Sequence, residues 1–194
     1  MRNTLKCWAR ASRAYKNAVP AAHGGTIKQN LVLIGMSGCG KSTVGRLTAE
    51  KLGLLFADTD SIVANTAKMS IKEIFAQMGE ETFRRLERQA VMYAAGLRGA
   101  VIATGGGVPE EQANIEALRK NGIILLLFRP VDVIAETVDK NTRPLFTNSE
   151  AVRALWQRRK EIYGKCADIT VPNTASPEEC AANIAALWQQ MRAQ

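Results

Sequence analysis

The strongest constraint on the fold is a short glycine-rich stretch, GMSGCGKST (residues 35–43), which directly follows the apolar run LVLI (31–34). The stretch matches the pattern G-x-x-x-x-G-K-[ST], and the helical pattern after it includes the apolar residues Val44, Leu47 and Leu52. A buried strand, a glycine loop and a helix in this order are typical of a phosphate-binding loop. The sequence therefore predicts an α/β domain that begins with such a loop.

Short apolar runs alternate with helical patterns from Leu31 onward. The strand candidates are LVLI (31–34), LLFA (54–57), AVIA (100–103), IILLLF (123–128) and DITV (168–171). Each run is apolar on both faces and precedes a polar or glycine-rich turn, as in parallel strands that helices cover on both sides. A length of 194 residues suits one domain with a buried core. We therefore expect a three-layer α/β/α domain.

The glycine loop supplies the groups that hold a nucleoside triphosphate. Its glycines let successive N–H groups point into one concavity, and the helix N-terminus adds a favourable dipole for phosphate. Lys41 is placed to reach the β- and γ-phosphates, and Ser42 offers a hydroxyl to Mg²⁺. We expect a nucleoside triphosphate, with magnesium, at Gly35, Gly38, Cys39, Gly40, Lys41, Ser42 and Thr43. Amide dipoles around Cys39 would favour its thiolate, but we expect a small space-filling residue there.

Two carboxylates follow the second apolar run in the sequence Asp58-Thr59-Asp60. In an extended segment, residues i and i+2 point the same way, so both should face the carboxyl end of the sheet, where ligands of α/β domains bind. One can order magnesium-bound water, and the other can take a proton from the acceptor. The alternative is that Asp60 serves as a helix N-cap, which would explain one carboxylate but not both.

Three consecutive glycines end the third apolar run in ATGGG (103–107). Propensity gives no reason for them to follow AVIA unless the backbone approaches another group closely. The N–H groups of Gly106 and Gly107 are candidates to bind hydroxyls or a carboxylate of a ligand. The alternative is an ordinary tight turn before Pro109.

Three arginines stand out by their surroundings. One helical stripe consists of Val152, Leu155, Trp156, Arg159 and Tyr163. A guanidinium on an apolar face needs an anion, which is either an internal carboxylate or a ligand. Arg84 borders an apolar helix face, with Glu87 three positions on. Arg143 lies in the polar segment KNTRPLFTN (140–148), which we expect to be a mobile loop. A mobile arginine suits phosphoryl transfer. The alternative for each is a surface salt bridge.

The net charge of +8 is concentrated at one end of the chain. Residues 1–30 hold six of the 26 Lys and Arg residues and no acid, so the remainder has 20 basic and 18 acidic residues, a net charge of +2. A nearly neutral body argues against nucleic acid as a partner. No apolar stretch approaches the length of about 18 residues that a membrane span needs.

Residues 1–29 lack strong apolar periodicity and contain the breaker-rich stretch PAAHGG (20–25). We expect a basic, disordered extension, with an organelle transit peptide as the alternative, followed by one domain over residues 30–194. The four cysteines lack the spacing of a metal site, and no secretory segment is evident, so they indicate free thiols in a reducing compartment. We therefore expect a cytoplasmic protein that is a monomer.

Taken together, these stretches resemble the shikimate kinase family of small ATP-dependent enzymes over residues 31–190. The motifs that carry the resemblance are GMSGCGKST, FADTD, IFAQMGEETFRRLE, ATGGG, RPL and RRKEIYGKCADITV. Their order and spacing match throughout, and FRRLE, GGG and RPL together are more specific than the loop alone. The resemblance implies a five-stranded parallel sheet in the order 2-3-1-4-5 with a mobile lid. It also implies transfer of the γ-phosphate of ATP to the 3-hydroxyl of shikimate.

The resemblance also implies roles for particular residues. Asp60 would bind the acceptor hydroxyl and act as the base, with Lys41 and the lid residue Arg143 as further catalytic residues. Asp58 would order magnesium-bound water, and Ser42 would bind the metal. The other residues implied around the acceptor are Arg84, Arg159, Gly106 and Gly107 as ligands, Glu87 orienting Arg84, and Phe75 and Phe83 lining the ring pocket.

The chain departs from the family pattern at three places. Glu136 stands seven residues before Arg143, where the family usually has a nucleotide-contacting arginine, and Lys140 is a candidate to compensate. The RRKEIYG stretch lacks the family's proline, so its helix end is open to change. The expected adenine loop near Asn173 lacks the usual basic residue.

Two alternative functions remain open from the sequence alone. One is phosphorylation of another small metabolite, as in gluconate-type kinases of the same fold, against which the DTD and FRRLE motifs argue. The other is a non-catalytic nucleotide-binding regulator or a nucleic-acid-linked ATPase. The neutral body and the complete set of Asp58, Asp60 and Arg143 argue against this second class.

Overall fold

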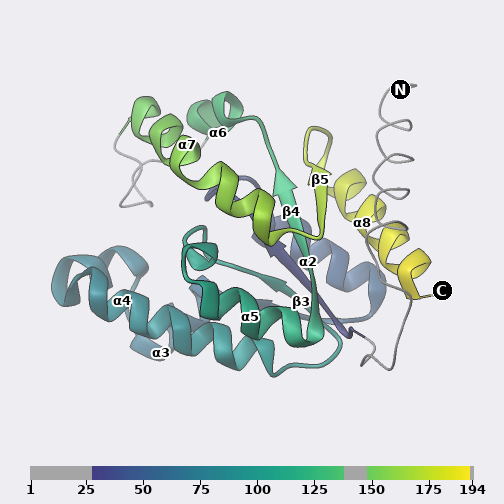
Figure 1. The fold of residues 1–194 in the computed structure, drawn as a ribbon, viewed down its shortest axis with the longest axis horizontal. Coiled ribbons are helices and arrows are strands. Elements are labelled where there is room, and N and C mark those ends of the chain that lie inside the picture. Colours follow the sequence, from purple (N-terminus) through teal and green to yellow (C-terminus); the bar gives the residue numbers. More distant parts are fainter. Residues whose placement is uncertain (1–27, 138–147, 193–194) are drawn as a thin grey trace.

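The computed structural model describes residues 28–137 and 148–192 (Figure 1). Its five strands are β1 (Asn30–Ile34), β2 (Leu55–Asp58), β3 (Ala100–Ala103), β4 (Gly122–Phe128) and β5 (Ile169–Pro172). All neighbouring strands pair in parallel, in the order β2-β3-β1-β4-β5. The predicted strand order is confirmed, and each strand begins and ends within one residue of its predicted position.

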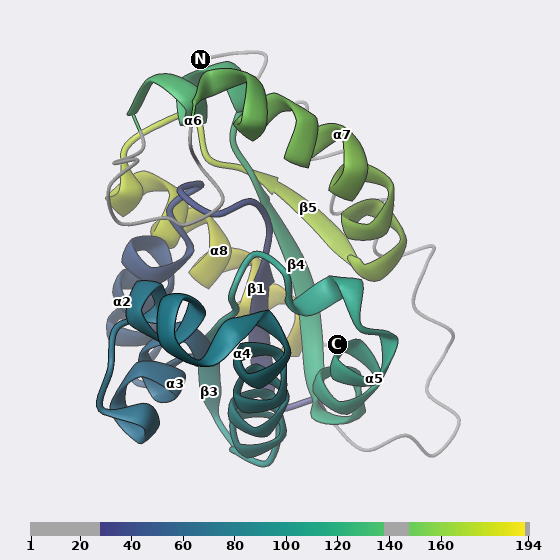
Figure 2. The ribbon, with the colours of Figure 1, turned by 90° about the vertical axis from the view of Figure 1, so that its left-hand side faces the viewer.

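Helices cover both faces of the sheet. They are α2 (Lys41–Leu52), α3 (Thr59–Ala67), α4 (Ile71–Ala95), the 3₁₀ helix η1 (Val108–Glu110), α5 (Gln112–Asn121), α6 (Val131–Thr137), α7 (Ser149–Cys166) and α8 (Pro177–Arg192). Figure 2 shows the strands between α2 and α8 on one side and α5 and α7 on the other. The expected three-layer α/β/α architecture is therefore present. No helix of the described residues is long and apolar enough to cross a membrane.

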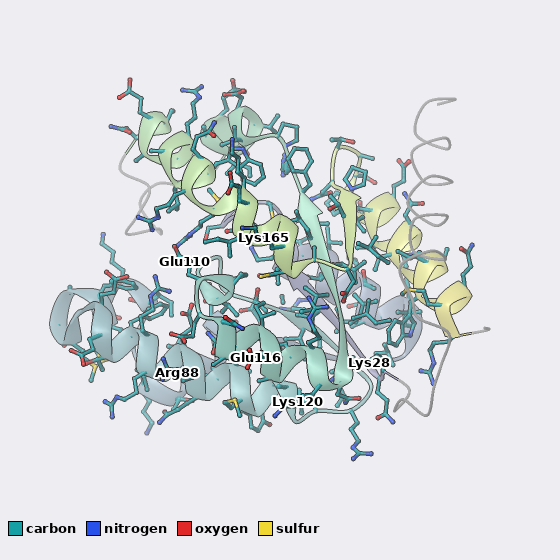
Figure 3. The ribbon with its side chains drawn as sticks, viewed as in Figure 1. Lys28, Arg88, Glu110, Glu116, Lys120 and Lys165 are labelled. Atoms are coloured by element: carbon teal, nitrogen blue, oxygen red, sulfur yellow. The ribbon has the colours of Figure 1, made fainter. Side chains whose placement is uncertain are left out.

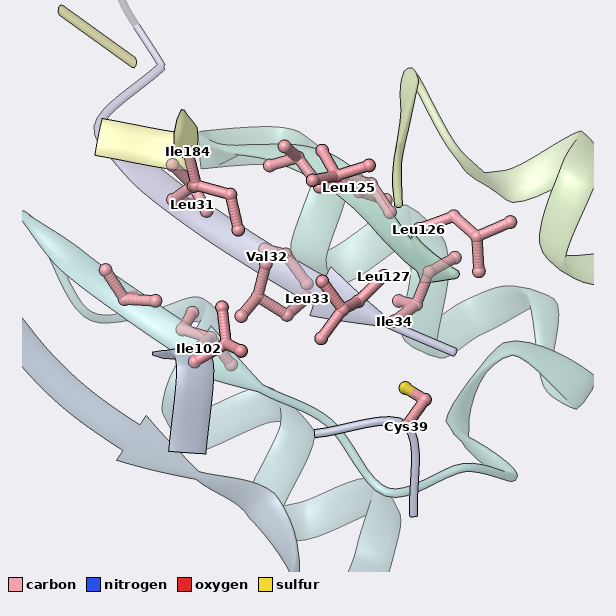
Figure 4. Close-up of a cluster of buried hydrophobic side chains, with 14 of the residues drawn as sticks. Leu31, Val32, Leu33, Ile34, Cys39, Ile102, Leu125, Leu126, Leu127 and Ile184 are labelled. Atoms are coloured by element: carbon pink, nitrogen blue, oxygen red, sulfur yellow. The ribbon is translucent and has the colours of Figure 1, made fainter. Parts of the chain in front are cut away.

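The core lies along the two central strands. Every residue of β1 from Leu31 to Ile34 is fully buried, and β4 contributes Leu125 and Leu127 beside them (Figure 4). Burying one such side chain stabilises a fold by about 1.5–3 kcal/mol. Because helices cover both faces of these strands, both sets of alternating side chains are apolar, which explains the continuous apolar runs.

Helix α4 carries much of one side of the candidate site, and local signals fix where it begins. Ser70 accepts a hydrogen bond from the Glu73 N–H at 3.2 Å, and the Glu73 carboxylate accepts one from the Ser70 N–H at 2.8 Å. This reciprocal pair is a capping box. Gly79 interrupts the helical backbone with φ of 78° and ψ of 169°, a conformation that glycine adopts without strain. The segment after this break carries Phe83, Arg84 and Glu87.

The chain already contacts the body two residues before β1. The Lys28 ammonium donates to the carbonyl groups of Arg119 and Lys120 at the end of α5. The Gln29 N–H donates to the carbonyl of Asn121 at 3.0 Å. Residues 28 and 29, which the sequence placed in the extension, therefore help to cap α5.

Candidate active site

All five strands end at the same edge of the sheet because they are parallel, and the candidate site is built from the segments that follow them. The glycine loop follows β1 and leads into α2, and its glycines 35, 38 and 40 have φ of 140°, 82° and 100°. Lys41 is the first residue of α2 and is 7% exposed. Its ammonium donates to the carbonyls of Gly35 and Met36, both at 2.8 Å. Lys41 therefore folds back across its own loop.

Cys39 packs inward from the same loop. Its side chain is 1% exposed and belongs to the apolar core cluster, near Ile34 and Leu126 (Figure 4). Its N–H donates to the Met36 carbonyl at 3.2 Å, within the turn of the loop. This position fits the expected space-filling role.

Asn173 is a residue of the site whose role the sequence did not reveal. It follows β5 and is 5% exposed, and its side-chain amide donates to the Cys39 carbonyl at 2.8 Å. A Cβ at Gly40 would lie 2.7 Å from the Asn173 Nδ2 atom, so a glycine is needed there to admit this amide. The sequence signals were a polar residue directly after an apolar strand and the expected adenine loop nearby, and neither predicted this contact with the glycine loop. Asn173 therefore ties the glycine loop to the last strand.

Asp58 lies beside the start of α2. Its Oδ2 accepts a hydrogen bond from the Ser42 hydroxyl at 2.5 Å, and its Oδ1 accepts one from the Ser61 N–H at 3.1 Å. The N-cap of α3 is therefore Asp58, and the alternative in which Asp60 would be the cap is wrong. The extended geometry expected for Asp58 to Asp60 is also wrong, because β2 ends at Asp58 and the helix begins at Thr59.

Asp60 nevertheless reaches the same edge of the sheet from the first turn of α3. A Cβ at Gly105 would lie 2.5 Å from the Asp60 Oδ1 atom and 3.0 Å from the Glu87 Oε1 atom, which places both carboxylates against that glycine. Thr59, between the two aspartates, is fully buried and accepts a hydrogen bond from the Gly105 N–H at 2.8 Å. A helical turn, and not strand alternation, brings Asp60 into the site.

The three glycines after β3 each make room for a different neighbour. At Gly106, a Cβ would lie 2.8 Å from the Ser37 hydroxyl oxygen, and at Gly107 it would overlap with the Arg84 guanidinium. We expected these glycines to admit a ligand to the backbone. Instead, side chains of the protein itself occupy the space that the three Cβ atoms would take: Asp60 at Gly105, Ser37 at Gly106 and Arg84 at Gly107.

Arginines and carboxylates form a connected network on the acceptor side of the site. Arg84 donates to Glu87 at 2.8 Å and to Glu80 at 3.1 Å, as the spacing of Arg84 and Glu87 predicted. Arg159 is 2% exposed and donates to Glu110 at 2.7 Å. The Nη2 atom of Arg84, which also contacts Glu80, lies 3.7 Å from the same Glu110 carboxylate. The sequence predicted the buried position of Arg159 but not its partner.

Burial and the neighbouring arginines shift the pKa values of two carboxyl groups of this network, Glu87 and Glu110, in opposite directions. Burial raises the pKa of the Glu87 carboxyl above its ordinary value of 4.5, although the hydrogen bond from Arg84 works against this. Burial would likewise raise the pKa of Glu110, but Arg159, Arg158 and Arg84 outweigh it and hold that pKa below the ordinary value. Glu110 is therefore a carboxylate at neutral pH.

Helix α7, which carries Arg159, is joined to the glycine turn by an aromatic residue. The Tyr163 hydroxyl donates to the Gly106 carbonyl at 2.8 Å, and its ring stacks against Trp156 with centroids 6.2 Å apart. Burial raises the pKa of this tyrosine well above its ordinary value, so its hydroxyl stays protonated and remains a donor. The helix continues to Cys166 without the family's proline. Tyr163 thus links α7 to the glycine turn.

Two phenylalanines from α4 stand beside the arginines. The rings of Phe75 and Phe83 have centroids 4.5 Å apart, and the Arg84 guanidinium lies over the Phe83 ring at 5.4 Å. The stacked ring therefore helps to orient Arg84. Arg143 and Lys140 lie outside the described residues.

The fold and the glycine loop define a P-loop kinase of small molecules, and comparisons with known proteins identify the family. The shikimate kinase family model matches residues 37–189. A shikimate kinase from Clostridium botulinum (strain Eklund 17B / Type B) is 38% identical over 159 residues, which is 81% of this chain and 96% of that protein. One from Caldanaerobacter subterraneus is 44% identical over 147 residues, covering 74% and 85%. The chain belongs to the shikimate kinase family.

Solved structures of shikimate kinases are similar to this chain over most of its length. A shikimate kinase from Acinetobacter baumannii in complex with shikimate has a TM-score of 0.81 and 30% identity, covering 94% of this chain and 99% of that one. The Aquifex aeolicus shikimate kinase has a TM-score of 0.73 and 32% identity, covering 82% and 96%. A gluconokinase from Sinorhizobium meliloti, at a TM-score of 0.54 and 15% identity, shares the fold alone.

Proposed function

We propose that this protein transfers the γ-phosphate of ATP to the 3-hydroxyl of shikimate, giving shikimate 3-phosphate and ADP. The observation that carries the proposal is a juxtaposition at one sheet edge. The phosphate-binding loop lies there beside a turn of three glycines, around which Arg84 and the buried Arg159 converge. A carboxylate-bearing acceptor bound to these arginines would lie next to the phosphate that it receives.

The nucleotide side supports ATP with magnesium. Lys41 can exchange the carbonyls of Gly35 and Met36 for phosphate oxygens. Ser42 and Asp58, whose oxygens lie 2.5 Å apart, present the hard oxygen ligands that Mg²⁺ prefers, and this metal usually completes its shell with water and phosphate. When bound, the ion would neutralise charge on the transferring phosphoryl group. The residues present therefore fit the metal.

Asp60 is proposed as the group that binds the acceptor hydroxyl and takes its proton. It lies beside Glu87 at the glycine turn, on the acceptor side of Asp58. The charge of Asp60 contributes to the raised pKa of Glu87, which shows that the two carboxyl groups interact. The glycine turn contacts Asp60 at Gly105, the nucleotide loop at Gly106 and Arg84 at Gly107, so a base at Asp60 would lie near both binding regions.

The acceptor's carboxylate is assigned to Arg84 and Arg159, with the N–H groups of Gly106 and Gly107 as further donors. Guanidinium groups bind carboxylates through two parallel hydrogen bonds, which fixes orientation as well as charge. Phe75 and Phe83 offer an apolar wall for the ring of the acceptor. Arg143 is assigned to the transferring phosphoryl group.

The wider setting of the enzyme follows from composition. We propose that it acts on a small molecule without nucleic acid, because the body outside residues 1–30 has a net charge of only +2. We also propose that it acts as a monomer. The cysteines of the described residues, 39, 166 and 180, are free thiols, which fits a reducing compartment such as the cytoplasm.

A coupled assay of ADP release tests the proposed function. ADP should appear in the presence of ATP, magnesium and shikimate, and phosphorus NMR should show the phosphate on the 3-hydroxyl. Gluconate serves as the alternative acceptor. ADP release that depends on gluconate, or that is the same with and without shikimate, would contradict the proposal.

A further inference from the structure

Glu110 occupies an unusual position in the network around the acceptor. It ends η1, directly after the glycine turn, and Figure 3 shows it between α7 and the pair α4 and α5. Its carboxylate lies 2.7 Å from Nη2 of Arg159, 3.2 Å from Nη2 of Arg158 and 3.7 Å from Nη2 of Arg84. One carboxylate therefore bridges the two guanidinium groups that are assigned to the acceptor's carboxylate.

The charge of Arg159 explains why an anion is needed there. A guanidinium that is 2% exposed is destabilising unless it is paired, and Glu110 provides the paired charge within the described part of the chain. In the same part of the chain, the Nε atom of Arg159 is buried without a hydrogen-bond partner. Arg159 thus has both a replaceable partner and a donor to spare.

Glu110 itself is able to leave. Its side chain is 27% exposed, so solvent reaches it, whereas Arg159 stays inside. Its other oxygen already accepts a hydrogen bond from Arg158, whose side chain is 66% exposed. If Glu110 turned toward Arg158, it would keep one charged partner in water, and the space between Arg84 and Arg159 would open.

We propose that Glu110 fills the carboxylate site of the acceptor in the ligand-free protein and that the acceptor's carboxylate displaces it, so that Glu110 sets the apparent affinity for the acceptor. This inference rests on the proposed function. An incoming carboxylate replaces the negative charge of Glu110 beside Arg159. The buried guanidinium therefore stays paired throughout the exchange. A neutral acceptor would leave Arg159 unpaired and is therefore discriminated against.

Competition of this kind lowers apparent affinity. The measured dissociation constant exceeds the intrinsic one by the inverse of the fraction of molecules in which the site is open. Replacing the carboxylate by a neutral amide weakens the internal competitor but keeps its shape. We therefore expect Glu110→Gln to lower the dissociation constant for shikimate by about 3- to 30-fold.

Titration calorimetry with shikimate and with its methyl ester tests this on the full chain. Glu110→Gln should bind shikimate more tightly than the unchanged protein does, and in both proteins the ester should bind more weakly than shikimate, because it carries no charge to pair with Arg159. The matched control is Glu111→Gln. Glu111 is the next residue and pairs with Arg88 at 3.0 Å, and among the described residues it forms no ion pair with Arg84 or Arg159, so this variant should bind both ligands normally.

A crystal structure of the unchanged protein with shikimate gives a readout that depends on no variant. Glu110 should have left Arg159, and the shikimate carboxylate should have taken its place. The inference is overturned if Glu110 still contacts Arg159 in that complex, or if Glu110→Gln binds shikimate equally or more weakly. If the unchanged protein neither binds nor phosphorylates shikimate, the proposed function fails instead.

Discussion

The glycine loop and the acceptor pocket meet at one edge of the sheet but are held by different kinds of contact. In the loop, Lys41 and its main-chain partners lie within six positions of one another. In the acceptor pocket, Glu110 and Arg159 are 49 positions apart and come from η1 and α7. Backbone contacts shape the first region, and pairs of opposite charge shape the second.

This difference separates a rigid region from an exchangeable one. Hydrogen bonds within a short loop are fixed by the same backbone that a phosphate must meet, so the loop is prepared in advance. An ion pair can be replaced by another ion pair of the same charge, so the pocket can trade Glu110 for a ligand. Changes in the loop should therefore affect turnover, and changes in the pocket should affect acceptor affinity.

The largest effect is expected for Lys41→Ala. The side chain serves phosphate and its own loop, so kcat should fall by at least about 10³-fold, while loss of its hydrogen bonds should cost about 2 kcal/mol of stability or less. Steady-state kinetics and thermal melting measure both. Lys51→Ala, an exposed lysine at the end of the same helix, is the control. Near-normal turnover in Lys41→Ala would overturn the assignment of the loop.

The two aspartates at the boundary between the regions should fail in different ways. Asp60→Asn removes the proposed base, so kcat should fall by about 10²–10⁴-fold with little change in ATP affinity. Asp58→Asn should raise the magnesium requirement, and because asparagine is also a good N-cap, α3 should remain stable. Magnesium titrations and melting curves on both variants separate these effects. If both variants keep their turnover, the carboxylates are structural.

Arg159→Ala should change the acceptor's affinity and spare the nucleotide's. Removing one partner of a buried charge pair costs about 2–5 kcal/mol, so KM for shikimate should rise by about 30-fold or more while KM for ATP changes little. Arg153→Ala is the control, since Arg153 lies on the same helix and pairs with the exposed Asp132 at 2.8 Å. An equal effect on both substrates would make Arg159 a purely structural residue.

The smallest effect is expected outside both regions. We propose that residues 1–27 are dispensable for catalysis, because the assigned chemical groups all lie beyond residue 30. Deleting them, while keeping Lys28 and its contacts with the end of α5, should leave kcat, both KM values and the melting midpoint nearly unchanged. A marked fall in any of these would show that the segment packs on the body.

What the sequence could predict follows the same division. The strands could be located because burial on both faces leaves continuous apolar runs, and the glycine loop because its chemistry is local. The cap at Asp58 was missed because we expected the strand to continue through Asp60. In the structure the strand ends at Asp58, and α3 begins at the next residue. No role could be predicted for Glu110, because its partner Arg159 lies 49 positions further on and reaches it only when α7 packs beside η1.

The turn at residues 105–107 also limits how a sequence of this kind can drift over generations. A side chain at the first position would collide with Asp60, at the second with Ser37, and at the third with Arg84. These neighbours come from three separate segments, which are α3, the glycine loop and α4, so one substitution could not make room for a side chain at all three positions. A side chain at each of these three positions would therefore displace a different residue of the site: Asp60, Ser37 or Arg84.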